Sequence, residues 1–313
     1  MWYFFRQAKE LPASDFQQFG VEACFRDRQL SGLVEKRLDD SSRAVILFAG
    51  GKPAGAYALS DNSCKPISLS DFSNLKANAD GDIRALLLPN RAMRLVWLSL
   101  ESQVQNVFTV QMEEAWKNQL QQWQEIKWNG LAEVYCETYH GFALFQNGEA
   151  QENDIFFSSS EGFTSEFCNA GEARGLPRKV ITFDLSTETQ AYRCTVLRQG
   201  VVHWSRSLLA RYRELVGQKL LRSLEHQVNI VIRPWAWEIS LADGTFVDSH
   251  FFLHSDYAAQ AYRAILMSAG TQMNFVIGSN LTLKLLADTF ASLPASEAAM
   301  LLSHRLIPAA FSE

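Results

Sequence analysis

Residues 31–57 read SGLVEKRLDDSSRAVILFAGGKPAGAY, and a related stretch recurs at residues 129–154 as NGLAEVYCETYHGFALFQNGEAQEND. Each stretch contains an apolar-rich run, a polar break, a second run that ends in Phe, a two-residue turn and a third run. The turns are Gly50–Gly51 and Asn147–Gly148. Both dipeptides tolerate positive φ at two successive positions, which a type I′ hairpin turn requires. We therefore expect each stretch to form a three-stranded antiparallel meander.

The two stretches align when Gly32 is placed opposite Gly130 and the first turn of the second copy is one residue shorter. The identical pairs are then Gly32 and Gly130, Leu33 and Leu131, Glu35 and Glu133, Leu47 and Leu144, Phe48 and Phe145, and Gly51 and Gly148. A helix is predicted before each meander, because a helix can bury the apolar face of a small sheet. Apolar residues at helical spacing indicate the second helix at 112–126, and Ser14 with Asp15 offers an N-cap for the first.

The predicted fold class is α+β. Two repeated helix-plus-antiparallel-meander units, at residues 1–110 and 111–200, precede a smaller α/β module at residues 201–313. Runs of β-forming residues predict further strands, and these are Ile83–Leu88, 106–110, Val180–Leu185, Ala191–Leu197, Trp235–Leu241 and Met273–Ile277. Periodic apolar residues predict further helices, and these are 68–75, 91–104, 205–224, a segment from Ser255, 281–290 and a segment from Pro294. Asp243 followed by Gly244 predicts a hairpin turn.

The first stretch has an early glycine, an apolar strand and a glycine turn. The positions that form this pattern are Gly32, Leu33, Val34, Val45, Leu47, Phe48, Gly51, Lys52, Pro53 and Ala54. At these positions the chain resembles the PATAN-type domains of bacterial signalling proteins. The second copy matches less well, because its post-turn segment 149–151 is more polar. The order of elements in the last third is similar to roadblock or longin domains, which often accompany bacterial GTPase switches. These resemblances imply an interaction or regulatory module with a protein partner such as a small GTPase, and they carry no catalytic residue.

Composition limits the possible functions. With 313 residues, 47% of them hydrophobic, the chain is long enough for two or three domains with their own cores. A net charge of −5 without runs of Lys or Arg argues against nucleic-acid binding. Five scattered cysteines without a CxxC spacing indicate reduced thiols in the cytoplasm. We expect no signal peptide and no membrane partner, because Arg6, Lys9 and Glu10 interrupt the first apolar residues and no apolar run reaches about 18 residues.

One cluster has the residue types of a metal site. His250 and His254 are four residues apart and would share a face if their segment were helical, with Asp248 nearby. Such a group would suit Zn²⁺ or Mn²⁺. The competing interpretation is structural, because Ser255 marks a helix start, Asp248 suits a turn and Asp256 suits the first turn of a helix. We expect no cofactor.

Motifs for nucleophilic catalysis or phosphate binding do not occur in the sequence, which lacks Gly-x-Ser-x-Gly, a P-loop and GxGxxG. No catalytic residue is therefore predicted. Trp235 and Trp237 alternate on a predicted strand, where their rings would either fill the core or form a partner site.

Two functions follow from these patterns. The first is a non-enzymatic regulatory or scaffold protein that acts through protein–protein contacts in bacterial signalling, either as a monomer or as a homo-oligomer. The alternative is a small-molecule- or metal-binding protein, or an enzyme, with a site near Asp248–Asp256 or between the two repeated units. The first is favoured because the repeat points to interaction and no catalytic site is recognisable.

Overall fold

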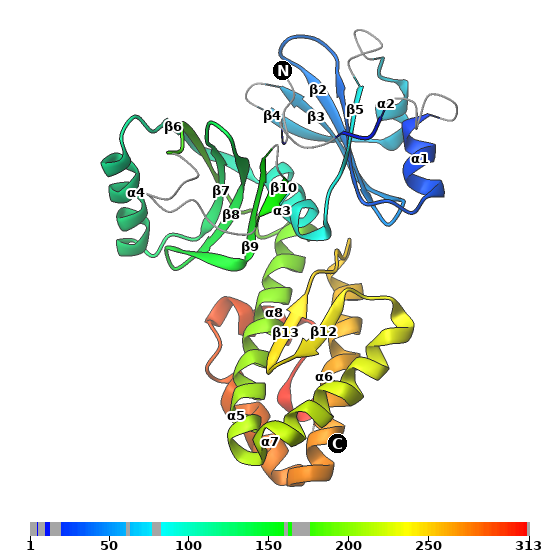
Figure 1. Ribbon diagram of the computed structural model, residues 1–313, viewed down its shortest axis with the longest axis vertical. Helices are drawn as coiled ribbons and strands as arrows, with labels where there is room; N and C mark the ends of the chain where they lie inside the picture. Colours follow the sequence, from blue (N-terminus) through cyan, green and yellow to red (C-terminus); the bar gives the residue numbers. More distant parts are fainter. Residues whose placement is uncertain are drawn as a thin grey trace. The chain divides into compact units, whose positions relative to one another are not determined.

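The computed structural model describes residues 5, 10–12, 20–60, 63–76, 83–159, 162–164 and 176–311. The protein belongs to the α+β class, with helices alongside antiparallel sheets (Figure 1). It divides into two compact units, Met1–Ser186 and Thr187–Glu313, which we call the N-terminal unit and the C-terminal unit. Within the described ranges, no helix has the length and apolar character needed to cross a membrane.

The first sheet of the N-terminal unit has the strand order β4-β3-β2-β1-β5. Its elements are α1 (Val21–Asp27), β1 (Gly32–Arg37), β2 (Arg43–Ala49), β3 (Lys52–Ser60), β4 (Ser63–Ile67), α2 (Leu69–Asn74) and β5 (Ile83–Leu87). β1, β2 and β3 form the first predicted meander, and each strand runs antiparallel to the next. A capping box between Ser68 and Asp71 begins α2.

The second sheet has the order β10-β9-β8-β7-β11-β6, and β7, β8 and β9 form the second predicted meander. The elements are α3 (Asn90–Leu100), β6 (Gln103–Thr109), α4 (Glu113–Glu125), β7 (Gly130–Tyr135), β8 (His140–Gln146), β9 (Glu149–Ser159), β10 (Gly162–Thr164) and β11 (Lys179–Asp184). Trp116 and Trp123 of α4 pack into the core on one face of this sheet. α3 is buried along nearly its whole length, because it contacts both β2 of the first sheet and β7, β8 and β9 of the second.

The two meanders share their strand register and their turn contacts. Gly32 pairs with Phe48 in the first, and Gly130 pairs with Phe145 in the second. In both, the turn glycine also forms a hydrogen bond with the segment that follows the preceding helix. The N–H of Gly51 donates to the carbonyl oxygen of Leu30 at 2.7 Å, and the N–H of Gly148 donates to that of Trp128 at 2.8 Å. Each turn is therefore anchored to the segment that follows the helix.

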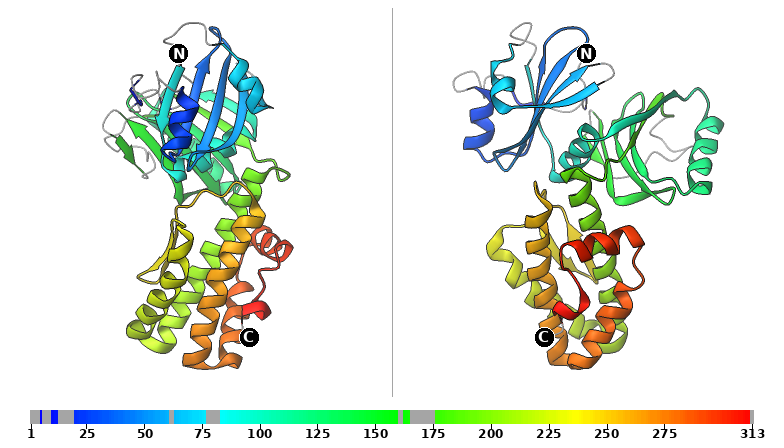
Figure 2. Two further views of the ribbon diagram at one scale, coloured as in Figure 1. Left: turned by 90° about the vertical axis from the view of Figure 1, so that its right-hand side faces the viewer. Right: turned by 180° about the vertical axis from the view of Figure 1, so that it is seen from behind.

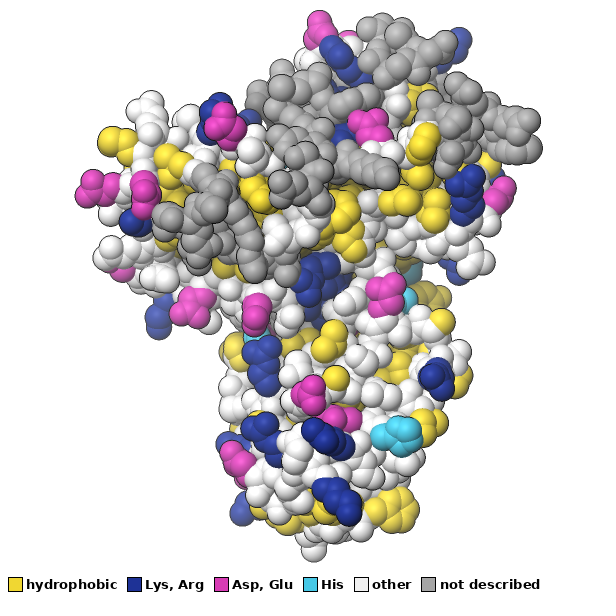
Figure 3. All heavy atoms as spheres, in the orientation of Figure 1, with side chains coloured by type: hydrophobic (Ala, Val, Ile, Leu, Met, Phe, Trp, Pro, Cys, Tyr) yellow, Lys and Arg dark blue, Asp and Glu magenta, His cyan; other side chains and the backbone are white. Residues whose placement is uncertain are grey.

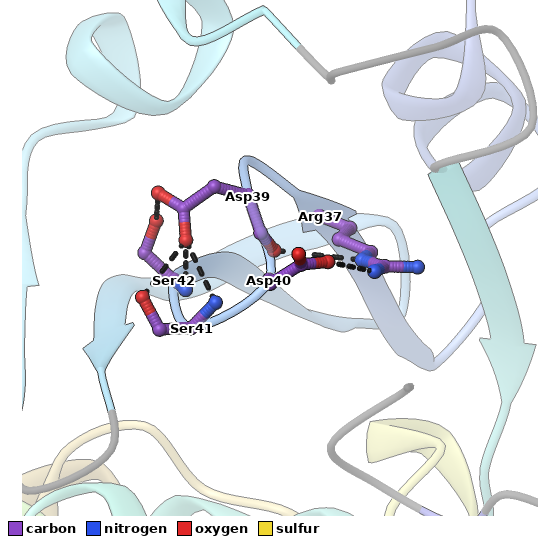
Figure 4. A network of polar contacts seen from close by, with 5 residues as sticks. All are labelled: Arg37, Asp39, Asp40, Ser41 and Ser42. Carbon is purple, nitrogen blue, oxygen red and sulfur yellow. Dashed lines mark hydrogen bonds and ion pairs between the residues drawn. The ribbon is translucent and has the colours of Figure 1, made fainter.

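The connection between β1 and β2 is closed by Asp39 (Figure 4). Its carboxylate accepts hydrogen bonds from the backbone N–H groups of Ser41 and Ser42, each at 2.7 Å, and from both serine hydroxyls. Arg37 pairs with Asp40 at 2.6 Å in the same turn. Hydrogen bonds hold the pKa of the Asp39 carboxyl well below its usual range, and the bond from the Ser42 hydroxyl has the largest effect. The ionised carboxylate thus fixes the turn that aligns β1 with β2.

The C-terminal unit is a helical layer with a small hairpin. Its elements are α5 (Gln190–Ile232), η2 (Arg233–Trp235), β12 (Ile239–Ala242), β13 (Thr245–Asp248), α6 (Ser255–Ile277), α7 (Ser279–Phe290), α8 (Ala295–Ser303) and η3 (Pro308–Phe311). α5 is interrupted at Gly217, whose φ of 80° and ψ of 169° are not helical. The helices α5 and α6 pack against each other (Figure 2), and Trp204, Tyr212 and Tyr262 are among the fully buried side chains of this core.

Several predicted elements are confirmed, including α4, β5, β6, β11, α7 and the hairpin turn at Asp243–Gly244. Two predicted strands are wrong: Ala191–Leu197 lies in α5 and Met273–Ile277 lies in α6. A short apolar run cannot be distinguished from part of a buried helix by periodicity alone. The boundary predicted after residue 200 falls inside α5, since the compact units divide after Ser186.

Of the predicted N-terminal helix, the described residues contain α1. Its proposed N-cap at Ser14 and Asp15 lies outside them, and α1 begins at Val21. The helix predicted at 91–104 ends at Leu100, and its last turn is replaced by the start of β6.

Candidate functional site

A group of aromatic side chains lies at the surface of the C-terminal unit, after the end of α5. η2 follows α5, and Ala236 then adopts a left-handed φ of 52°. This turn brings the ring of Trp237 onto that of Trp235, with centroids 5.1 Å apart and planes inclined by 11°. A nearly parallel, offset pair is a favourable arrangement of two indoles.

The loop between β13 and α6 completes this group. The ring of Phe252 lies edge-on to Trp237, at 6.4 Å and 62°, and His250 lies edge-on to Phe252, at 4.5 Å and 68°. Trp237 and Phe252 pack partly against the core of the unit, whereas 60% of Trp235 is exposed. We call Trp235, Trp237, His250 and Phe252 the aromatic surface. Its base is held by the core and its outermost ring faces solvent.

The strand predicted for Trp235–Leu241 is shorter than expected. β12 begins only at Ile239, so the two tryptophans do not alternate along a strand. Their rings are brought together by the 3-10 turn and the left-handed Ala236 instead. The sequence could have indicated this through Pro234, because proline suits the first turn of a helix and is disfavoured inside a strand.

The structure does not bring Asp248, His250 and His254 together as metal ligands. Asp248 is buried at the end of β13, where its carboxylate accepts from the hydroxyl of Tyr262 at 2.5 Å and from the N–H of His250 at 2.9 Å. His254 is the N-cap residue of α6, so the segment before it is not helical. The spacing of four residues therefore does not put His250 and His254 on a common helix face. Among the residues that the structure describes, no three His, Cys, Asp or Glu side chains form a group that could hold a metal ion.

A buried polar cluster in the N-terminal unit was not predicted from the sequence. Nε2 of His140 lies 2.8 Å from Oε1 of Glu133, and the hydroxyl of Tyr135 donates to the same oxygen at 2.8 Å. Glu133 is completely buried. The first sheet contains a comparable group, in which buried Glu35 lies 3.8 Å from Arg43. Alternation along a strand could not reveal these groups, because a polar residue on a strand is normally assigned to the solvent face.

A hollow of about 360 Å³ lies between the first sheet and the second within the N-terminal unit. Hydroxyl, thiol and amide groups line much of it, with four apolar side chains, and the lining residues are Leu59, Ser60, Ser63, Cys64, Ser99, Leu100, Ser102, Gln103, Val104 and Phe183. The thiol of Cys64 donates to the carbonyl oxygen of Leu100 at 3.1 Å. Burial, with the charge of Glu101, raises the pKa of this thiol to about 12. Cys64 therefore stays protonated at neutral pH and is a poor nucleophile.

Comparisons of the chain with family models, with curated proteins and with solved structures found no match. The resemblances to PATAN-type domains and to roadblock or longin domains stay predictions.

Proposed function

We propose that the protein is a non-enzymatic regulatory or scaffold protein of the bacterial cytoplasm that acts through protein–protein contacts. The observation that carries this proposal is the aromatic surface, in which the largely exposed ring of Trp235 stacks on a supported Trp237. Tryptophan is enriched among the few residues that dominate binding energy in protein interfaces. A partner that covers Trp235 would remove a large apolar ring from water. The ring is already held in place by Trp237, so binding would cost little side-chain entropy.

The charge pattern on one face of the molecule favours contact with a protein over contact with a polyanion. On the face drawn in Figure 3, basic and acidic side chains are interspersed among exposed hydrophobic ones. Such mixed charge is typical of an ordinary soluble surface and lacks the concentrated positive charge by which nucleic acids are bound. The partner suggested by the resemblance to roadblock-type domains is a small GTPase or another signalling protein.

The proposal is tested by capture of partners on immobilised protein. Wild type, Trp235→Ser and Phe275→Ser are compared, since Phe275 is an aromatic residue of the same unit that is 82% exposed and lies outside the aromatic surface. We expect a partner that wild type and Phe275→Ser retain and that Trp235→Ser loses, with all three proteins showing the same thermal unfolding. Retention by Trp235→Ser at the wild-type level, or no retained protein at all, would count against the proposal.

The hollow beside Cys64 favours a second function, that of a small-molecule-binding protein. Its lining offers hydroxyl, thiol and amide groups without a charged side chain, which suits an uncharged polar ligand. A panel of neutral sugars and polyols is screened by thermal shift against wild type and against Ser99→Leu, in which a buried lining hydroxyl is replaced. A ligand that stabilises wild type and not the variant would establish this function. Equal shifts in both proteins would exclude the hollow as its site.

A further inference from the structure

Phe5 is held by residues of both sheets of the N-terminal unit. Its N–H donates to Nδ1 of His140 at 2.9 Å, and its carbonyl oxygen accepts from Nη2 of Arg84 at 2.6 Å. Arg84 belongs to β5 of the first sheet, and His140 begins β8 of the second. Both main-chain groups of one residue are thus bound by side chains that lie far away in the sequence.

The side chain of Phe5 is also recognised. Its ring meets Phe142 edge-on, at 5.8 Å and 75°, and Phe156 edge-on, at 5.5 Å and 80°. The ring is completely buried. Edge-to-face pairs are favourable beyond the area that they bury, so these rings select an aromatic side chain over an aliphatic one.

The groups that bind Phe5 are positioned by two acids, of which Glu133 is buried and Glu10 is exposed. Because Nδ1 of His140 accepts from Phe5, the hydrogen bonds assign its ring proton to Nε2, which donates to Glu133. Tyr135 stacks on the imidazole, with centroids 4.2 Å apart, and donates to the same carboxylate. Arg84 is paired with Glu10 at 2.8 Å. Burying the carboxylate of Glu133 costs free energy. A phenylalanine that only filled the core would need apolar contacts and no such acid.

The backbone of Phe5 is unlike that of a residue paired in a sheet. Its φ of 42° lies in the left-handed region, which is unfavourable for a residue with a side chain. The surrounding contacts must offset this strain. Main-chain recognition by side chains, an aromatic pocket and a strained bound residue are together the features of a peptide-binding site.

We propose that Arg84, His140, Phe142 and Phe156 form an acceptor site for a phenylalanine residue within a peptide, and that Phe5 is its resident ligand. When Phe5 is removed, the site binds such a peptide from solution. The site belongs to the N-terminal unit and does not involve the aromatic surface, so its failure would leave the proposed function untouched.

The test uses the full chain carrying Phe5→Ala and a fluorescent synthetic peptide of residues 1–12. We expect the peptide to bind Phe5→Ala at least about tenfold more tightly than wild type, whose site is already filled. The same peptide with Phe5→Ala should bind at least about tenfold more weakly to the variant protein. Fluorescence anisotropy measures both affinities. Equal binding of the two peptides, or no binding to a folded Phe5→Ala protein, would overturn the proposal.

Two further proteins keep the test decisive. If Phe5→Ala does not fold, Phe5→Leu retains most of the side-chain volume and loses the edge-on aromatic contacts, and it is measured in the same way. If neither variant unfolds cooperatively, Phe5 is a structural core residue and the proposal fails. In the Phe5→Ala background, His140→Phe removes the main-chain acceptor, so a peptide affinity that is unchanged by it would contradict main-chain recognition.

Discussion

Glu35 and Glu133 occupy the same position in the two meanders, and both side chains are completely buried. Glu35 pairs across β2 with Val45, and Glu133 pairs across β8 with Phe142. Each acid interacts with the first residue of the neighbouring strand, which is Arg43 in one meander and His140 in the other. The two meanders therefore place an acid at the same buried position and pair it with different bases.

Replacing Glu133 tests how strongly the stability of the protein depends on this acid. Glu133→Leu would leave the Nε2–H of His140 and the hydroxyl of Tyr135 without their acceptor inside the protein. We expect the free energy of unfolding to fall by about 3 kcal/mol, measured by urea denaturation. Glu137→Ala is the control, since it removes an exposed pair with Arg178 and should cost less than about 1 kcal/mol. Similar decreases in the free energy of unfolding of both variants would show that the protein's stability does not depend on the buried acid.

The sequence shows that Glu35 and Glu133 correspond, but it does not show what surrounds them. The alignment with one residue fewer in the first turn of the second copy matches the observed registers, in which Arg37 pairs with Arg43 and Tyr135 with His140. Hairpin turns are predictable because they need particular residues at particular φ. Burial of an acid depends on what covers that face of the sheet, which is distant in the sequence and therefore invisible to local patterns.

The C-terminal unit was less predictable for the same physical reason. The apolar runs at Ala191–Leu197 and Met273–Ile277 are buried in long helices whose neighbours decide their conformation. The sequence predicts Trp235 and Trp237 on one strand, whereas the turn at Ala236 stacks their rings instead. The edge-on contact of Trp237 with Phe252, in the loop that carries His250, depends on tertiary contacts rather than on spacing.

The glycine at the second position of each hairpin turn should be irreplaceable, whereas the first position should tolerate substitution. A Cβ at Gly148 would lie 2.4 Å from the carbonyl oxygen of Trp123, and its φ is 81°. Gly148→Ala should therefore destabilise the protein by at least about 2 kcal/mol. At Gly50 a Cβ meets nothing within 4 Å.

Gly50→Asn is the matched control, because Asn147 holds the equivalent position with a φ of 52°. We expect its free energy of unfolding to stay within about 1 kcal/mol of wild type in urea denaturation. A stable Gly148→Ala protein would mean that the end of α4 can move away from the turn.

The turn closed by Asp39 should become less stable in acid. Its pKa is lowered in the folded protein, so its contribution is fully present above the unfolded value of about 3.9 and is lost as the pH falls through the folded value. Asp39→Ala should thus be less stable than wild type at neutral pH, and the difference should shrink below about pH 4. Chemical denaturation at a series of pH values measures it. Asp40→Ala removes only an exposed pair with Arg37 and should show no such trend, and a constant difference for Asp39→Ala would refute the assignment.

The thiol of Cys64 should resist alkylation although it lines a hollow. Its pKa of about 12 leaves only about one thiolate in ten thousand at pH 8, and the thiolate is the reactive form. Ser63→Cys places a reference thiol on the same strand at an exposed position, so iodoacetamide should modify the new thiol at least about tenfold faster than Cys64, as followed by peptide mass spectrometry. Since the charge of Glu101 is the second cause of the raised pKa after burial, Glu101→Gln should increase the rate at Cys64. If Cys64 reacts as fast as the reference thiol, the hollow is open enough to solvate a thiolate, and a nucleophilic role for this cysteine would have to be considered.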